Sequence, residues 1–192
     1  YWDRVDFDDP RLVRDGAFDQ LVTRYWSKVL PQIPDTMIVE AHALLDQVLK
    51  AGNKDMFKYM VHHMTYASES SKIMCMDKVF VDLVNSYYRT DMVDWLNEEQ
   101  LKKILDRAED LKYTLCGNKA PNITLPDLDQ ENWVKLHDIE AMYTLICIWE
   151  STCGHCKKEM PKLERIYDEW NPRGLEIFAI GNDFEPEPWQ EY

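Results

Sequence analysis

The stretch Trp149-Glu150-Ser151-Thr152-Cys153-Gly154-His155-Cys156-Lys157-Lys158-Glu159-Met160-Pro161 decides the fold of the second half of this 192-residue chain. An apolar run rich in β-branched and aromatic residues, 143–149, precedes it and predicts a buried strand. After Cys156, apolar residues recur at helical spacing as far as Trp170, which predicts an amphipathic helix. The two cysteines therefore lie where the carboxyl end of a strand turns into the amino end of a helix.

This position favours thiol chemistry. A thiolate at the first turn of a helix faces unpaired backbone N–H groups and the positive end of the helix dipole, so it forms more easily. We expect Cys153 to be exposed, to have a lowered pKa and to act as the nucleophile. Cys156, one turn deeper, is expected to be shielded and to act second, with its sulfur close enough to bridge. His155 adds a partly cationic ring beside the thiolate, which favours the dithiol and makes the pair more oxidising.

Three other uses of a cysteine pair fit this sequence less well. A structural zinc site needs four ligands, but Cys75, Cys116 and Cys147 are isolated in sequence and no HxxxH pair exists. A peroxiredoxin would have a threonine three residues before a lone reactive cysteine, whereas Thr152 directly precedes Cys153. A purely structural disulfide across so short a loop would be strained, which suits a labile redox bond better. We therefore interpret the pair as redox-active, with no metal and no cofactor.

The CGHC motif, its strand–helix context and a proline five residues after the second cysteine resemble the thioredoxin superfamily, within it the membrane-anchored envelope reductases of the TlpA/ResA type. Gly117-Asn118-Lys119-Ala120-Pro121, a hairpin-like segment 122–139 and Lys158-Glu159-Met160-Pro161 support the resemblance. It covers about residues 117–190 and implies a thioredoxin-like α/β domain over 117–192. It also implies thiol-disulfide exchange with protein substrates and with a thiol-disulfide electron partner.

Two residues bear on how the buried thiol loses its proton. Thioredoxin itself has a buried acid six positions before the first cysteine, where this chain has Cys147, a small core residue by default. ResA-type reductases carry an active-site glutamate three residues after the second cysteine, and Glu159 occupies that position. Glu159 is either this proton carrier or an ordinary solvated helix carboxylate.

The rest of the second half completes a strand–helix–strand unit. Residues 123–128 and 133–136 flank a polar turn and predict a hairpin, and 137–140 predict a short helical turn. Asn171-Pro172-Arg173-Gly174 ends the helix, and 175–180 predict a strand parallel to the first. The site then lies at the carboxyl ends of the strands. Residues 185–192 resemble the opening of a further helix, so we expect an incomplete domain in which one edge of the central strand is unpaired and open to oligomerisation.

Residues 1–112 predict a separate all-α domain, so the whole chain is expected to be a two-domain α+β protein. Residues 1–15 are polar and acidic and predict an extended lead-in. Five apolar stripes at helical spacing follow, with Gly52 as a helix end and Asn97 with Gln100 as a capping box. The methionines around Cys75 match a copper(I) cluster in type, but methionines at helical spacing usually fill cores. The stripes span residues 18–29, 37–48, 57–64, 79–87 and 101–111.

Composition limits the partners and the compartment. The net charge of −13 argues against nucleic acid and anionic membrane surfaces. No stretch is long enough to span a membrane, and the chain lacks an initiator methionine and a signal sequence, so we expect membrane association only through an N-terminal anchor outside it. The resemblance implies the periplasm or cell envelope. The alternative function is a non-catalytic binding module, in which the helical domain captures a partner.

Overall fold

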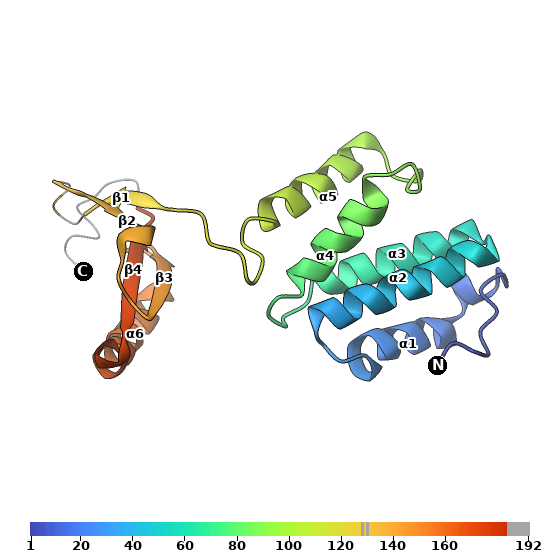
Figure 1. Ribbon diagram of the computed structural model, residues 1–192, viewed down its shortest axis with the longest axis horizontal. Coiled ribbons are helices and arrows are strands. Elements are labelled where there is room, and N and C mark those ends of the chain that lie inside the picture. Colours follow the sequence, from blue (N-terminus) through green and yellow to red (C-terminus); the bar gives the residue numbers. More distant parts are fainter. Residues whose placement is uncertain (128, 130, 184–192) are drawn as a thin grey trace. The chain divides into compact units, whose positions relative to one another are not determined.

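The computed structural model describes residues 1–127, 129 and 131–183, and the chain divides into two units, Tyr1–Ala120 and Pro121–Tyr192. The first unit is helical and the second contains all the strands (Figure 1). The prediction of an all-α region followed by an α/β region is confirmed. The expected helix opening at 185–192 lies outside the described residues.

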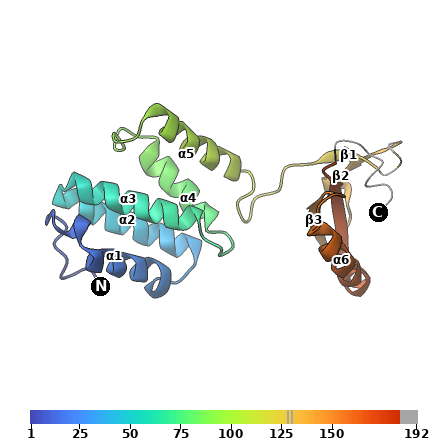
Figure 2. The same cartoon turned by 180° about the vertical axis from the view of Figure 1, so that it is seen from behind.

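The first unit consists of five α-helices, two of which end in a π-helical turn. In the views of Figures 1 and 2, α2 and α3 run side by side. The elements are a 3₁₀ turn at Leu12–Arg14, α1 (Gly16–Arg24) with its π turn Tyr25–Val29, α2 (Pro34–Ala51), α3 (Lys54–Glu69), α4 (Asp77–Leu83) with its π turn Val84–Tyr88, and α5 (Glu98–Leu111).

Local sequence signals fix the ends of these helices. Pro34 opens α2, where its missing N–H costs nothing, and Gly52 ends it with a φ of 84°, a conformation that residues with a side chain rarely adopt. Asn53 then caps α3 by accepting a hydrogen bond from the backbone N–H of Met56 at 3.1 Å. The capping box at the start of α5 is confirmed, because Asn97 and Gln100 each accept the other's backbone N–H.

The apolar stripes predicted from the sequence meet in one core. Each stripe places its residues on one helix face, and burying such a side chain contributes about 1.5–3 kcal/mol. The core includes residues with 1 % or less of their surface exposed from three different helices, among them Met37, Leu45, Met60, Val61, Val79 and Phe80. Met64 and Met76 are core residues as well, which agrees with the interpretation of the methionines as filler, whereas Met74, beside Cys75, is 83 % exposed and does not fill the core.

The first fifteen residues differ from the extended lead-in that their polarity predicts. Phe7 is buried in the core, and Trp2 packs against it. The side chain of Asn53 donates a hydrogen bond to the backbone carbonyl of Phe7 at 3.2 Å. The segment therefore folds onto the helices through its few aromatic residues, which composition averaged over the segment conceals.

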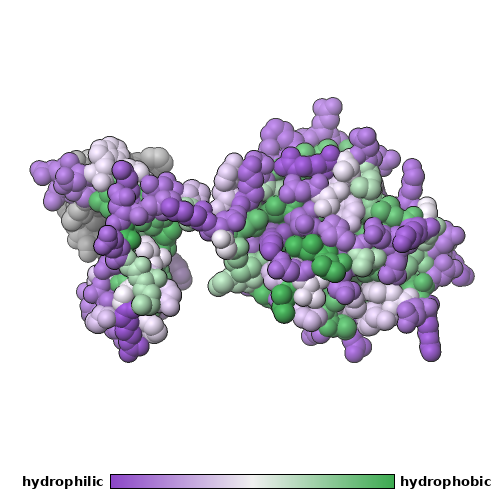
Figure 3. Space-filling model, viewed as in Figure 1, coloured by the Kyte–Doolittle hydropathy of each residue, from purple (hydrophilic) through white to green (hydrophobic). Residues whose placement is uncertain are grey.

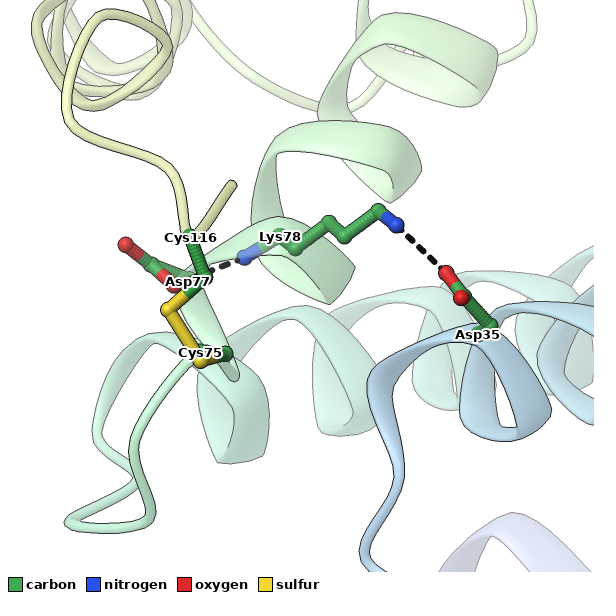
Figure 4. The surroundings of a disulfide bond; sticks show 5 residues. All are labelled: Asp35, Cys75, Asp77, Lys78 and Cys116. Atoms are coloured by element: carbon green, nitrogen blue, oxygen red, sulfur yellow. Dashed lines mark hydrogen bonds and ion pairs between the residues drawn. A yellow bond between two sulfur atoms is a disulfide. The ribbon is translucent and has the colours of Figure 1, made fainter. Parts of the chain in front are cut away.

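A disulfide joins two cysteines that the sequence leaves isolated. Cys75 and Cys116, 41 residues apart in sequence, have Cα atoms 5.5 Å apart and a bond between their sulfurs (Figure 4). Cys75 lies in the turn before α4, and Cys116 lies in the segment after α5. The spacing argument, in which Cys75 and Cys116 are isolated, therefore did not find this bridge. The packing of α4 and α5, not a local spacing rule, brings these two residues together.

The second unit has two small sheets and one helix. The hairpin pairs β1 (Thr124–Pro126) with β2 (Trp133–Lys135) in antiparallel register and ends in a 3₁₀ turn at Leu136–Asp138. The second sheet pairs β3 (Tyr143–Trp149) with β4 (Leu175–Gly181) in parallel, from Tyr143 opposite Leu175 to Trp149 opposite Gly181. The helix α6 (Cys156–Trp170) and a 3₁₀ turn at Asn171–Arg173 connect these strands. The predicted hairpin and strand–helix–strand unit are confirmed.

The expected burial of the strand before the CGHC motif is not seen. Ile148 is 68 % exposed and Tyr143 is 61 % exposed, and in the part of the unit that the structure describes β3 pairs with β4 alone. Hydrophobic residues accordingly reach the surface in this unit (Figure 3). The apolar composition of the run predicted the strand correctly, but burial also needs elements that cover both of its faces and its second edge.

Candidate active site: a sulfur-capped helix at the ends of two parallel strands

The two cysteines occupy the junction that the sequence predicts. After β3 ends at Trp149, a tight turn closed by the N–H of Cys153 and the carbonyl of Glu150 (3.1 Å) leads to Cys153. The helix α6 begins at Cys156. The site therefore lies at the carboxyl end of the parallel pair of strands, where open α/β sheets bind ligands.

A sulfur atom accepts the first backbone N–H of the helix. The start of α6 has no side-chain oxygen cap, and the backbone N–H of Cys156 instead donates a hydrogen bond to Sγ of Cys153 at 3.3 Å. The N–H of Lys157 donates to the carbonyl of Cys153 at 3.1 Å. The Cys153 sulfur thus receives a donor from the first helical turn, which stabilises its charged form more than its neutral form.

The two thiols differ in acidity in the predicted directions. The pKa of Cys153 is lowered, first because the side chain of Cys156 donates a hydrogen bond to its sulfur, and then because the backbone N–H groups of Cys156 and His155 do the same. Desolvation of the sulfur and, to a smaller extent, the charge of Glu150 oppose this effect. The pKa of Cys156 is raised, chiefly because its proton is held by Cys153.

The expected difference in burial between the cysteines is not seen, because both are half-buried. The acidity of Cys153 therefore comes from hydrogen bonds along the first turn and not from one sulfur being exposed while the other is shielded. His155, between them, is exposed at the end of the helix. Its backbone N–H contributes to the lowered pKa of Cys153, which agrees with the unpaired N–H groups expected at the helix tip.

The carboxylate of Glu159 pairs with a neighbouring lysine. Its Oε1 accepts a hydrogen bond from Nζ of Lys162 at 2.7 Å, and the pKa of Glu159 is lowered chiefly by this bond. The side chain is about half exposed. It lines a shallow groove beside β3 together with Cys147 and Met160. A role of Glu159 in proton transfer from Cys156 stays a prediction.

Cys147 is the third free thiol of this unit. It is half-buried, and its sulfur lies 3.9 Å from Sδ of Met160 on α6. This contact fits the predicted role of a small packing residue between strand and helix. Among the described residues, no group of three or more His, Cys, Asp or Glu side chains is arranged to hold a metal ion.

A residue that the sequence argument missed accepts hydrogen bonds from the turn that leads to the cysteines. The carboxylate of Asp183, two residues after β4, accepts hydrogen bonds from the hydroxyl of Ser151 at 2.7 Å and from its backbone N–H at 3.1 Å. Ser151 is only 6 % exposed. The sequence could have indicated this contact. A polar residue just beyond the second of two parallel strands lies at the same sheet edge as the turn beyond the first strand.

Comparisons with known proteins identify both halves of the chain. Residues 116–188 match the AhpC/TSA family, and residues 1–111 match the domain of unknown function DUF5106. A thioredoxin-like protein from Bacteroides caccae has the same fold, with a TM-score of 0.69 and 20 % identity over all of this chain and 69 % of its own. The second unit is thus a thioredoxin-like domain.

Two curated relatives share sequence with this thioredoxin-like part. The thiol-disulfide oxidoreductase ResA of Halalkalibacterium halodurans is 35 % identical over 78 residues, which are 41 % of this chain and 43 % of that protein. The ResA of Oceanobacillus iheyensis is 32 % identical over 83 residues, 42 % of this chain and 43 % of that protein. The chain therefore spans less than half the length of these relatives. Because DUF5106 matches more than half of the chain, the protein belongs to the DUF5106 family, with a thioredoxin-like domain after that region.

Proposed function

We propose that the protein is a thiol-disulfide oxidoreductase whose redox centre is the Cys153–Cys156 pair. The observation that carries this proposal is the hydrogen bond from the N–H of Cys156 to the sulfur of Cys153, with the pKa of the first thiol lowered and that of the second raised. The relatives named ResA, which are thiol-disulfide oxidoreductases, support the same activity.

The geometry supports a two-step exchange. The Cys153 thiolate attacks one sulfur of a substrate disulfide, which forms a mixed disulfide and releases the other substrate sulfur as a thiolate. Cys153 then no longer carries the charge that holds the proton of Cys156, so the second thiol ionises more easily. The Cys156 thiolate attacks Sγ of Cys153, which forms the Cys153–Cys156 disulfide and releases the reduced substrate. Two electrons pass from the pair to the substrate, and the reverse sequence oxidises a dithiol.

Glu159 is proposed to accept the proton of Cys156 in the second step, as its position three residues after that cysteine implies. Its pairing with Lys162 means that it would act once this exposed ion pair has opened. A Glu159→Gln variant is expected to slow release of the mixed disulfide and to leave its formation unchanged. If both steps keep their rates, Glu159 is a surface carboxylate with no part in the reaction.

An insulin-reduction assay with a small dithiol as electron donor tests the activity. The wild-type chain is expected to accelerate reduction, Cys153→Ser to abolish it, and Cys156→Ser to accumulate a mixed disulfide that mass spectrometry detects. Cys147→Ser is the matched control, since it removes the third free thiol outside the pair. Partner binding without turnover, unchanged in Cys153→Ser, would instead establish the binding-module alternative.

Alkylation at mildly acidic pH tests the order of the two thiols separately. A lowered pKa means that the thiolate of Cys153 persists as the pH falls, whereas the raised pKa of Cys156 keeps that thiol protonated. Peptide mapping is therefore expected to find the label on Cys153. Preferential labelling of Cys156 would contradict the assignment of the nucleophile.

We further propose that the protein acts in the cell envelope. The Cys75–Cys116 disulfide supports this location, because such bonds persist in oxidising compartments. None of the described helices is both long and apolar enough to cross a bilayer. The apolar side chains that β3 exposes, Tyr143 and Ile148 among them, support self-association through this face, which sedimentation at several concentrations would detect.

A further inference from the structure

We propose that Asp183 is a positioning residue for the redox pair, which holds the turn before Cys153 so that its sulfur meets the first N–H of α6. The inference rests on the proposed function and adds a residue to its machinery that lies thirty residues away in sequence. Asp183 is not a catalytic residue in this scheme, because it acts through Ser151.

Within the part of the chain that the structure describes, the side-chain hydrogen bonds of Asp183 go to this turn. Its Oδ1 accepts the Ser151 hydroxyl at 2.7 Å, and its two oxygens lie 3.1 and 3.3 Å from the Ser151 nitrogen. The backbone continues the connection, because the N–H of Asn182 donates to the carbonyl of Trp149 at 2.8 Å. Asn182 and Asp183, the two residues after β4, therefore both bind the end of β3 and the turn that follows it.

The turn that Asp183 holds determines where the Cys153 sulfur lies. Ser151 is two residues before Cys153, inside the turn that the N–H of Cys153 closes on the carbonyl of Glu150. The hydroxyl of Thr152 braces the same turn by donating to Oε1 of Glu150 at 2.9 Å. Without Asp183 the buried Ser151 hydroxyl and N–H lose their acceptor, so the turn relaxes to find others. The hydrogen bond from the N–H of Cys156 to the Cys153 sulfur, which depends on the place of Cys153, then weakens.

Loss of positioning and loss of charge at Asp183 have opposite expected effects on the Cys153 thiolate. The groups that act on the Cys153 sulfur are Glu150, which disfavours the thiolate, and the backbone N–H groups of His155 and Cys156 with the Cys156 thiol, which favour it. Removing a further negative charge near the site would favour the thiolate if charge alone mattered. Loss of positioning removes a hydrogen bond to the thiolate and disfavours it. The direction of the change therefore identifies the mechanism.

The experiment compares Asp183→Ala with Asp183→Asn in the full chain. The rate of iodoacetamide labelling at Cys153 is measured at pH 6 by peptide mapping. We expect Asp183→Ala to label about fivefold more slowly than wild type, the equivalent of losing one hydrogen bond of about 1 kcal/mol. Asp183→Asn, whose amide oxygen still accepts the Ser151 hydroxyl, is expected to stay close to wild type although it has lost the same charge.

The matched control is Asp168→Ala, which removes an exposed carboxylate from α6 and is expected to leave labelling unchanged. Should Asp183→Ala fail to fold by circular dichroism, Ser151→Ala removes only the hydroxyl bond and is expected to slow labelling about twofold. Labelling of the folded Asp183→Ala or Ser151→Ala variant as fast as wild type, or faster, overturns the proposal. Because alkylation needs no disulfide turnover, this failure is distinguishable from an absence of insulin reduction, which would refute the proposed function.

Discussion

The two cysteine pairs of this protein are opposites in sequence and in environment. Cys75 and Cys116 are 41 residues apart and are bonded, in a unit whose core buries residues from every helix. Cys153 and Cys156 are three residues apart, free and half-buried, in a unit where Leu136 and Phe178 are the buried apolar side chains among the residues described. Distance in sequence makes the first pair a constraint on folding, whereas the helix tip lowers the pKa of Cys153 in the second pair.

Removing the long-range bridge should have the largest effect. Closing a loop of 41 residues restricts the unfolded chain by about 4 kcal/mol in the chain-entropy treatment. The double variant Cys75→Ser/Cys116→Ser is therefore expected to lower the free energy of unfolding of the helical unit by about this amount, measured by urea denaturation followed by circular dichroism. Cys153→Ser/Cys156→Ser is the control and should leave that transition in place. Equal midpoints for the bridge variant and wild type would show that the packed helices alone set the stability.

Changing the residue between the reactive cysteines should have the next largest effect. His155 has a φ of −74°, which proline can adopt, so His155→Pro removes the ring and the N–H without straining the backbone. The ring and the N–H of His155 each favour the Cys153 thiolate and so stabilise the dithiol form of the pair. A more stable dithiol form means a higher reduction potential. We therefore expect the reduction potential of the pair to be lower by roughly 50 mV in His155→Pro. The change runs from a wild-type value close to that of disulfide isomerase, about −180 mV, toward the thioredoxin value of about −270 mV.

Equilibration in glutathione buffers measures this potential. His155→Ala, which keeps the N–H, separates the contribution of the ring from that of the backbone. An unchanged potential in His155→Pro would mean that other groups set the redox balance of the pair.

The smallest effect concerns the caps of two helices that begin differently. The box of Asn97 and Gln100 caps α5 through oxygen atoms, whereas α6 begins on the Cys153 sulfur. Asn97→Ala is expected to destabilise the helical unit by about 1 kcal/mol, because the backbone N–H of Gln100 loses its side-chain acceptor. Cys153→Ser places an oxygen at the start of α6 and should cost almost no stability while abolishing activity. A large loss of helicity in Cys153→Ser would mean that the sulfur is needed for the fold as well.

Most of the local structure could be predicted from the sequence because its causes are local. The periodicity of apolar residues locates the helices, and the β-branched run before Cys153 with the Gly174 stop locates the strands around α6. The position of both cysteines at the strand–helix junction, and the direction of their pKa shifts, follow from the same short stretch. These features depend on residues within a few positions of each other.

What the sequence missed depends on contacts between distant residues. Cys75 meets Cys116 only after the helices have packed, and Asp183 meets Ser151 only after β4 has paired with β3. Phe7 lies in a segment that is polar overall, and the burial of its ring is seen only in the packed core. The burial expected for β3 failed for the same reason, since burial depends on what covers a strand and not on its own composition.

A redox titration that follows both cysteine pairs in one sample tests the contrast most directly. The full chain is equilibrated in glutathione and dithiothreitol buffers, free thiols are blocked, and mass spectrometry reports each pair separately. The account predicts that Cys153–Cys156 is reduced near about −180 mV while Cys75–Cys116 remains oxidised down to about −300 mV. Reduction of Cys75–Cys116 first, or of both pairs at one potential, would contradict it.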